Sequence, residues 1–208
     1  MDGRYRFLIW FQKQPAKVKL YVPGNHDICM DKKWPKQLFD PERRDFAQLD
    51  HQYAMELFKN YDVKLLIDEE FIYEDVKFYG SPMTPSFHRQ NWVFNADRGE
   101  EISKYWAKIP SDVNVLITHG PPYGILDTIP LSFRQSPDED IHRGCKDLLG
   151  VIKKRLIKLK LHCFGHLHNH YGIVLEPVSQ TRDVLFSNGS VLNEDYKQVV
   201  KTPFIITL

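Results

Sequence analysis

Residues 113–118 read VNVLIT and run directly into His119-Gly120-Pro-Pro. An apolar run of this length is typical of a strand buried on both faces of a sheet. In two other segments a strand pattern is likewise followed by a loop that contains glycine next to His or Asn. Residues 17–27 read KVKLYVPGNHD, and residues 161–168 read LHCFGHLH. Because ligands of α/β sheets bind beyond the carboxyl ends of strands, we expect an α/β fold in which these three loops converge.

Helix and strand patterns alternate on both sides of these segments. Apolar spacing predicts helices at residues 5–12, 45–61, 100–108 and 145–159. Strands are expected at residues 17–22, 63–67, 113–118, 161–164, 173–175, 184–186 and 204–208. Residues 71–79 predict a hairpin around Glu74-Asp75, although this turn lacks the usual glycine. Residues 81–95 form a loop that is long for a passive connection.

Composition excludes several classes of protein. A chain of 208 residues suits one domain, and a net charge of +1 gives no electrostatic case for binding a nucleic-acid polymer. No apolar run approaches the ~18 residues of a membrane span, and the N-terminus lacks a secretory signal. Three widely spaced cysteines fit neither a disulfide framework nor a zinc ribbon. We therefore expect a cytoplasmic protein without a membrane partner.

The three loops carry residue types that bind metal ions. Imidazole nitrogens and amide oxygens are suitable ligands for Mn, Fe or Zn, and the adjacent glycines allow a close approach. Each loop alone could be an ordinary turn or surface histidine, but all three at strand ends favour a joint metal site. His51, His88 and His162 are interpreted as structural histidines.

The motifs Gly24-Asn25-His26-Asp27, His119 and Gly165-His166-Leu167-His168 resemble the last three signature blocks of the calcineurin-like metallophosphoesterases. Residues 118–127 (THGPPYGILD) and 188–191 (NGSV) resemble the subgroup with metallophosphoesterase-domain proteins and cyclic-nucleotide phosphodiesterases. The resemblance implies a four-layer α/β/β/α sandwich, with residues 1–208 as a single domain. It also implies two-metal hydrolysis of a phosphodiester, possibly a cyclic nucleotide, or of a phosphomonoester.

The same resemblance implies a role for each motif residue. Asn25, His119 and His166 would hold one of two divalent ions (Mn, Fe or Zn), and His168 would help to hold the other. His26 would be catalytic, because it would donate a proton to the leaving group or stabilise charge on the phosphoryl oxygens.

The two earlier motifs of the family, Asp-x-His and Gly-Asp, do not occur ahead of Gly24. We therefore expect ligands for about one ion and a sandwich that lacks its first strand, truncated relative to the family. Asp2 is a candidate for the bridging carboxylate and is otherwise a solvated terminal residue.

Three interpretations stay open. The chain is a fragment or a mis-started gene model of an active phosphoesterase, an inactive metal-binding or scaffold protein, or an enzyme with replacement ligands. Asp127, His142 and His170 are the candidates for such replacements. His142 and His170 are also candidates for contact with a phosphate-ester substrate. The sequence predicts no oligomeric state.

Overall fold

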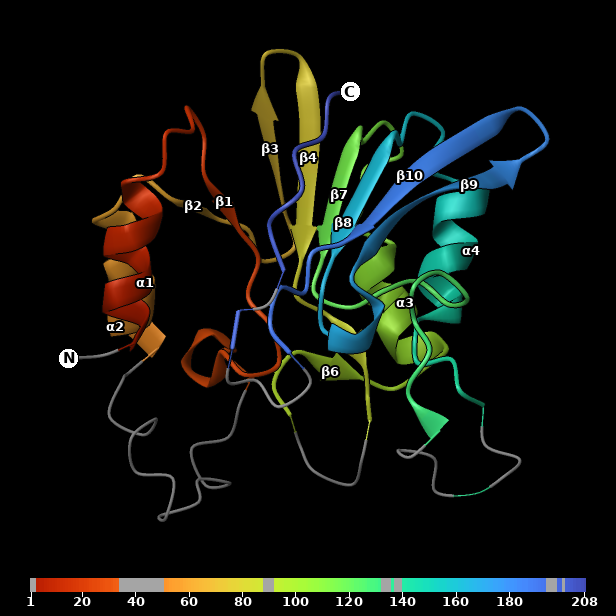
Figure 1. Ribbon diagram of the computed structural model, residues 1–208, viewed down its shortest axis with the longest axis horizontal. Helices are drawn as coiled ribbons and strands as arrows, with labels where there is room; N and C mark the ends of the chain where they lie inside the picture. The colour runs from red at the N-terminus through yellow and green to blue at the C-terminus, as the bar shows by residue number, and fades with distance from the viewer. Residues whose placement is uncertain are drawn as a thin grey trace.

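The computed structural model describes residues 3–33, 51–87, 92–131, 136, 140–193, 198–199 and 201–208, with side chains from Arg6 onward. Its centre is a mixed sheet of six strands (Figure 1). In spatial order the strands are β3 (Glu69–Tyr73), β4 (Val76–Ser81), β7 (Val115–Thr118), β8 (Leu161–Phe164), β10 (Arg182–Asn188) and β9 (Gly172–Ser179). The four inner strands are parallel and both outer strands are antiparallel to their neighbours. The carboxyl ends of the inner strands therefore meet at one edge of the sheet, the lower edge in Figure 1.

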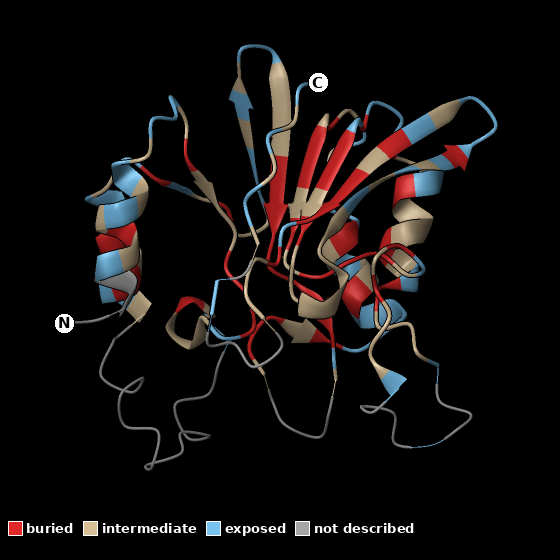
Figure 2. Ribbon diagram, in the orientation of Figure 1, coloured by how far each residue is buried: buried red, intermediate tan, exposed pale blue. Residues whose placement is uncertain are grey.

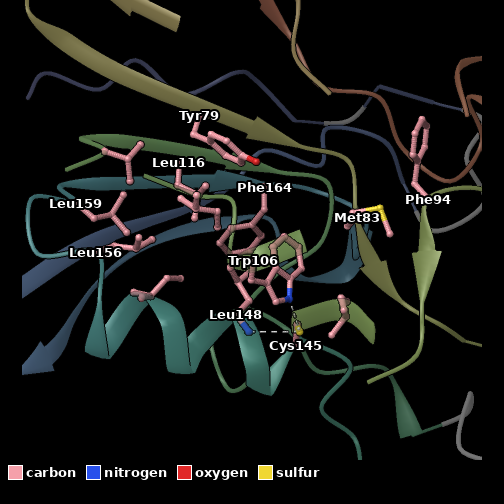
Figure 3. Close-up of a cluster of buried hydrophobic side chains, with 14 of the residues drawn as sticks. Tyr79, Met83, Phe94, Trp106, Leu116, Cys145, Leu148, Leu156, Leu159 and Phe164 are labelled. Carbon is pink, nitrogen blue, oxygen red and sulfur yellow. Dashed lines mark hydrogen bonds between the residues drawn. The ribbon is translucent and has the colours of Figure 1, made fainter. Parts of the chain in front are cut away.

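Two helices contact each other beside this sheet. They are α3 (Glu100–Trp106) and α4 (Lys146–Lys154). Their apolar side chains join the strands in one buried cluster, which includes Trp106, Leu116 and Leu148 (Figure 3). The thiol sulfur of Cys145 accepts hydrogen bonds from Trp106 Nε1 at 3.3 Å and from the backbone N–H of Leu148 at 3.4 Å. Cys145 thus caps the start of α4 and anchors the indole in the core.

A second group of elements lies at the left of Figure 1. Helices α1 (Gly3–Gln12) and α2 (His51–Lys59) lie beside a two-stranded parallel sheet of β1 (Leu20–Tyr21) and β2 (Lys64–Leu65). This group packs closely against β4 at Gly80, where an added Cβ would lie 2.4 Å from Leu66 Cβ and 2.8 Å from Val22 Cγ2. The six-stranded sheet and the β1–β2 pair therefore approach each other at a glycine because no side chain fits between them.

The hairpin predicted at residues 71–79 is confirmed as β3 and β4. Glu74 and Asp75 connect them with φ values of 47° and 63°. Two successive positive φ values are typical of a type I′ turn, whose twist matches that of the flanking strands. Residues other than glycine adopt a positive φ at a cost in conformational free energy. Two further short strands, β5 (Thr84–Pro85) and β6 (Asn95–Ala96), pair in parallel within the long loop.

Burial follows the sheet toward its carboxyl edge. Figure 2 shows buried residues where the sheet meets α3 and α4, whereas the far ends of β3–β4 and β9–β10 are mostly a mixture of intermediate and exposed residues, with Val178 of β9 buried. Among the helices that the structure describes, none has the length and apolar character needed to cross a bilayer. The sequence prediction of an α/β protein is confirmed at the level of a mixed sheet with helices.

Several predicted bounds are wrong. The expected strand at residues 204–208 is not formed; this segment has no ladder, and Ile205 is 99% exposed. The segment is held instead by side chains, because Phe204 stacks on Tyr171 and the hydroxyl of Tyr171 donates to the carbonyl of Thr202. Helix α4 ends at Lys154 and not at residue 159. The strands predicted at 17–22 and 63–67 shrink to two residues each, and residues 45–50 of the predicted helix lie outside the described residues.

Candidate metal centre

Three loops from distant parts of the sequence meet at the carboxyl edge of the strands. Asn25 follows β1, His119 follows β7 and His166 follows β8. Nε2 of His119 lies 2.7 Å from Oδ1 of Asn25, and the rings of His119 and His166 have centroids 4.8 Å apart. The backbone N–H of Gly165 donates to the carbonyl of His119 at 3.0 Å. The structure therefore brings together the three residues expected to share one metal ion.

Gly24 makes this approach possible. A Cβ at this position would lie 2.2 Å from Cε1 and 2.4 Å from Nδ1 of His119, which is far inside contact distance. The turn is fixed from its other side, because Asp27 Oδ2 accepts the N–H of Gly24 at 2.7 Å and the hydroxyl of Tyr21 donates to the same carboxylate. The backbone of Gly24 thus leaves no room for a side chain between itself and the imidazole of His119.

His166 has a strained backbone. Its φ of 70° is in the left-handed region, which costs a residue with a side chain about 1 kcal/mol or more. Strain of this kind persists only where the surroundings hold it, and it is concentrated at functional sites. Here the ring of His166 is held between His119 and Phe87, with the Phe87 centroid 5.1 Å away.

The electrostatic environment keeps the two enclosed histidines neutral. Burial, followed by the neighbouring His166, His26 and His168, holds the pKa of His119 well below its usual value. Burial, followed by His26 and His168, lowers the pKa of His166 to about 4. Both rings are therefore neutral at pH 7, which is the form that offers a lone pair to a metal ion.

His26 and His168 lie at the margins of this cluster. His26 is exposed, and its ring makes an edge contact with Trp92 at a centroid distance of 4.7 Å. Nδ1 of His168 lies 3.2 Å from the carbonyl oxygen of Asn193. Since a carbonyl oxygen only accepts, Nδ1 of His168 donates this hydrogen bond, and Nε2 is the nitrogen left to bind a metal in the neutral ring. An imidazole oriented in this way is suited to metal binding.

His142 and His170 belong to a second group of contacts. The carboxylate of Asp127, 1% exposed, accepts backbone N–H groups at 2.8 and 3.0 Å and lies 2.6 Å from Nδ1 of His142. The hydroxyl of Thr128 is hydrogen-bonded to Nε2 of His170. Asp127 and His142 are thus paired with each other, and His170 is hydrogen-bonded to Thr128, the residue that follows Asp127.

An Asp-x-His triplet does occur in the chain, at Asp140-Ile141-His142, but it follows the Gly24 motif and does not precede it. Asp140 accepts the backbone N–H of His142 at 2.9 Å and the hydroxyl of Tyr123 at 3.0 Å. These contacts place the triplet in the second group, so it does not replace the family motif expected ahead of Gly24.

The donor set suits one divalent ion better than two. Asn25, His119 and His166 offer one amide oxygen and two neutral imidazoles, to which water can be added. Within the described ranges, no three or more His, Cys, Asp or Glu side chains are grouped so as to hold a metal. His168, the residue expected to help to hold the other ion, belongs to no such group, and Asp2 and His88 lie outside the described residues.

A model of the family described as "Calcineurin-like phosphoesterase" matches residues 3–170, which include every motif residue of the cluster. The chain belongs to the calcineurin-like phosphoesterase family. Among similar proteins are metallophosphoesterase domain-containing protein 1 of Homo sapiens and of Mus musculus, each 31% identical over 98% of this chain and 59% of its own length. A UPF0046 protein of Caenorhabditis elegans is 33% identical over 83% of this chain and 54% of its own length. The chain therefore spans between half and three-fifths of the length of these relatives.

Proposed function

We propose that this chain is a phosphoric ester hydrolase domain whose metal-binding residues are Asn25, His119 and His166. The substrate is a phosphodiester, with cyclic nucleotides as the leading class, or a phosphomonoester. The observation that carries the proposal is the contact of two neutral imidazoles and one amide oxygen at the carboxyl edge of the sheet.

A bound Mn, Fe or Zn ion would supply a Lewis acid that polarises the phosphoryl group. The chain contributes the rest. His119 and His166 stay neutral and oriented by burial and by the Gly24 and Gly165 backbones. His26 donates a proton to the leaving oxygen of the ester, from an exposed position steadied by the Trp92 ring. His168 is the ligand for a second ion, whose remaining ligands are not among the described cluster.

Aromatic rings beside these histidines support a nucleotide substrate. Phe87 and Trp92 lie with their planes 17° apart and centroids separated by 6.3 Å. The first contacts His166 and the second contacts His26, so both border the proposed reaction centre. A flat base can stack on such rings. His142 and His170 are proposed to contact the substrate from the second group.

We propose that residues 1–208 form one domain, because one buried cluster joins Leu8 and Phe58 to Leu116, Leu148 and Phe186. We propose that the β1–β2 pair and the six-stranded sheet correspond to the two sheets of a four-layer sandwich. We also propose that the β1–β2 sheet lacks the first strand of the family; it has two strands among the described residues, and a sheet of two strands has little stability on its own.

An inactive metal-binding or scaffold protein is the second candidate. It is favoured by the donor set, since the described part of the chain holds no group of three or more His, Cys, Asp or Glu side chains placed to bind a metal. Without a bridging carboxylate, a second ion has little to hold it. A related possibility is that the domain acts only as part of a longer active enzyme.

The test is metal content followed by turnover. The purified chain is exposed to Mn²⁺, separated from free metal and submitted to elemental analysis, with His119→Ala beside it. His51→Ala is the matched control, because His51 contacts the carbonyl of Cys29 outside the cluster. We expect about one ion per wild-type chain, retention in His51→Ala and loss in His119→Ala.

Turnover then separates the two candidates. Metal-loaded protein is assayed with bis(p-nitrophenyl) phosphate and with cyclic AMP. Hydrolysis that is slowed by His26→Ala without loss of metal supports the enzyme. Bound metal with no hydrolysis favours the binding protein, and a wild-type chain that binds no metal overturns both.

A further inference from the structure

His162 lies directly behind the loop that carries His119. This side chain of β8 is fully buried, and its Nε2 lies 2.7 Å from the hydroxyl oxygen of Thr118. The same hydroxyl lies 2.7 Å from the carbonyl oxygen of Gly120. His162, Thr118 and Gly120 therefore form one chain of hydrogen bonds that brackets His119.

The direction of these bonds follows from what each group can do. The carbonyl of Gly120 only accepts, so the Thr118 hydroxyl must give it its single proton. The oxygen of Thr118 must then accept from Nε2–H of His162. His162 is thus the neutral tautomer with its proton on Nε2, in agreement with a pKa that burial lowers to about 3.

This arrangement leaves Nδ1 of His162 as a lone pair without a partner. It is buried and has no hydrogen-bond partner within the described residues. A buried unpaired acceptor destabilises a protein by about 1–3 kcal/mol. The neighbours in register, Leu116 and Phe186, are apolar, as expected for buried positions in central strands. An apolar residue at position 162 would avoid the cost.

The buried imidazole of His162 offsets this cost because its hydrogen bond to Thr118 holds the turn at the proposed metal centre. His119 is otherwise held by backbone bonds to Ser81 and Gly165 and by the contact of its ring with Asn25. The bond from His162 orients the Thr118 hydroxyl, and this hydroxyl closes the turn from residue 118 to residue 120 with His119 at its centre. The imidazole of His119 leaves this turn toward Asn25.

We propose that His162 is a positioning residue for the metal centre, acting through Thr118 to fix the loop that presents His119. The inference rests on the proposed role of His119 as a metal ligand. Groups that orient a ligand from outside the coordination sphere change metal affinity by about 10- to 100-fold. We therefore expect a loss of that size when the relay is cut.

The experiment measures Mn²⁺ and Zn²⁺ affinity and thermal stability on the full chain. Thr118→Val keeps the shape and removes the hydroxyl, whereas Thr118→Ser keeps the hydroxyl. His162→Leu removes both the donor and the orphaned acceptor. We expect about 10- to 100-fold weaker binding in Thr118→Val and His162→Leu, and recovery to within a few-fold in Thr118→Ser.

A merely structural role predicts a different pattern. His162 would then affect the melting temperature alone, and metal affinity would not follow the hydroxyl of Thr118. Wild-type affinity in both Thr118→Val and His162→Leu overturns the inference and leaves the proposed function intact. If the wild-type chain binds no metal, or if His119→Ala binds metal as tightly as the wild type does, both the proposed function and this inference are overturned.

A measurement on the wild type protects the test against variants that do not fold. Nitrogen-15 NMR of the histidine rings reports which nitrogen carries the proton. We expect one histidine, assigned to His162, to be protonated at Nε2 and unprotonated at Nδ1 at pH 7. Protonation of His162 at Nδ1 would overturn the relay.

Discussion

Gly24→Ala adds a single methyl group, and we expect this group to displace the His119 ring at the proposed metal centre. The new methyl carbon would lie 2.2 Å from Cε1 of His119, whereas ordinary contact begins at 3.4 Å. One of the two groups must therefore move by about 1.2 Å. The ring of His119 has little room, because Asn25 lies 2.7 Å from its Nε2 and the ring of His166 lies on another side. The backbone of Gly24 is held by Asp27.

Overpacking of this kind costs about 1–3 kcal/mol. For a chain of this length, each kcal/mol lowers the melting temperature by roughly 2–4 °C. A binding constellation tolerates displacements of only about 0.5 Å, so we expect the affinity for Mn²⁺ to fall at least tenfold. The assay pairs a metal titration with thermal denaturation followed by circular dichroism.

Gly150→Ala is the matched control. A Cβ at Gly150 meets nothing within 4 Å, and the residue lies inside α4. Alanine in a helix interior is more favourable than glycine by about 1 kcal/mol, so we expect unchanged metal affinity and a slightly higher melting temperature. If Gly24→Ala bound metal like the wild type and melted at the same temperature, His119 would not lie against Gly24 and the geometry of the centre would be refuted.

Three further predictions concern the scaffold. The pKa of His162 is about 3 in the folded state and about 6.5 in the unfolded chain, so protonation of this group favours unfolding. Its contribution to the free energy of unfolding is constant above pH 6.5 and falls by about 2 kcal/mol at pH 5. Urea denaturation should show this loss in the wild type, and an equal loss in His162→Leu would contradict it. Asp75→Gly relieves a φ of 63° beside Glu74 and should raise the unfolding free energy by about 1 kcal/mol, whereas a lower melting temperature would argue against the turn. Cys145→Ala leaves the Trp106 N–H without its acceptor and should cost about 1–3 kcal/mol in thermal denaturation, with Cys145→Ser as the control that keeps an acceptor; equal stability of the two variants would count against this bond.

The sequence was sufficient to predict the arrangement of the loops. An apolar strand followed by His119, and glycines beside Asn25 and His166, are local patterns, and they predicted strands β7 and β8 and their meeting loops. The close contact of Gly24 with the His119 ring explains why a glycine stands there. No pattern along the chain reveals the contact between His119 and Asn25, because 94 positions separate these two residues.

Elements that depend on a distant partner were not predictable from local patterns. Residues 204–208 (FIITL) have the residue types of a strand but pair with no strand among the described residues, and Phe204 stacks on Tyr171 instead. The separation of the β1–β2 pair from the main sheet is also a tertiary feature, since it depends on the packing of Leu66 and Val22 against Gly80.

His162 shows a different limit of sequence reasoning. Nine histidines in 208 residues produce some close pairs by chance, so the sequence alone predicts a structural role for His162. The available signal was its place in the buried run LHCF, three residues before Gly165, where an apolar side chain is the common choice. Only the bond to Thr118 shows what the imidazole contacts.

Metal content of the wild type, His51→Ala and His119→Ala, measured by elemental analysis after exposure to Mn²⁺, tests the central claim most directly. The claim predicts about one ion per chain in the first two proteins and almost none in His119→Ala. Equal metal content in all three proteins would contradict the assignment of Asn25, His119 and His166 as the metal-binding residues.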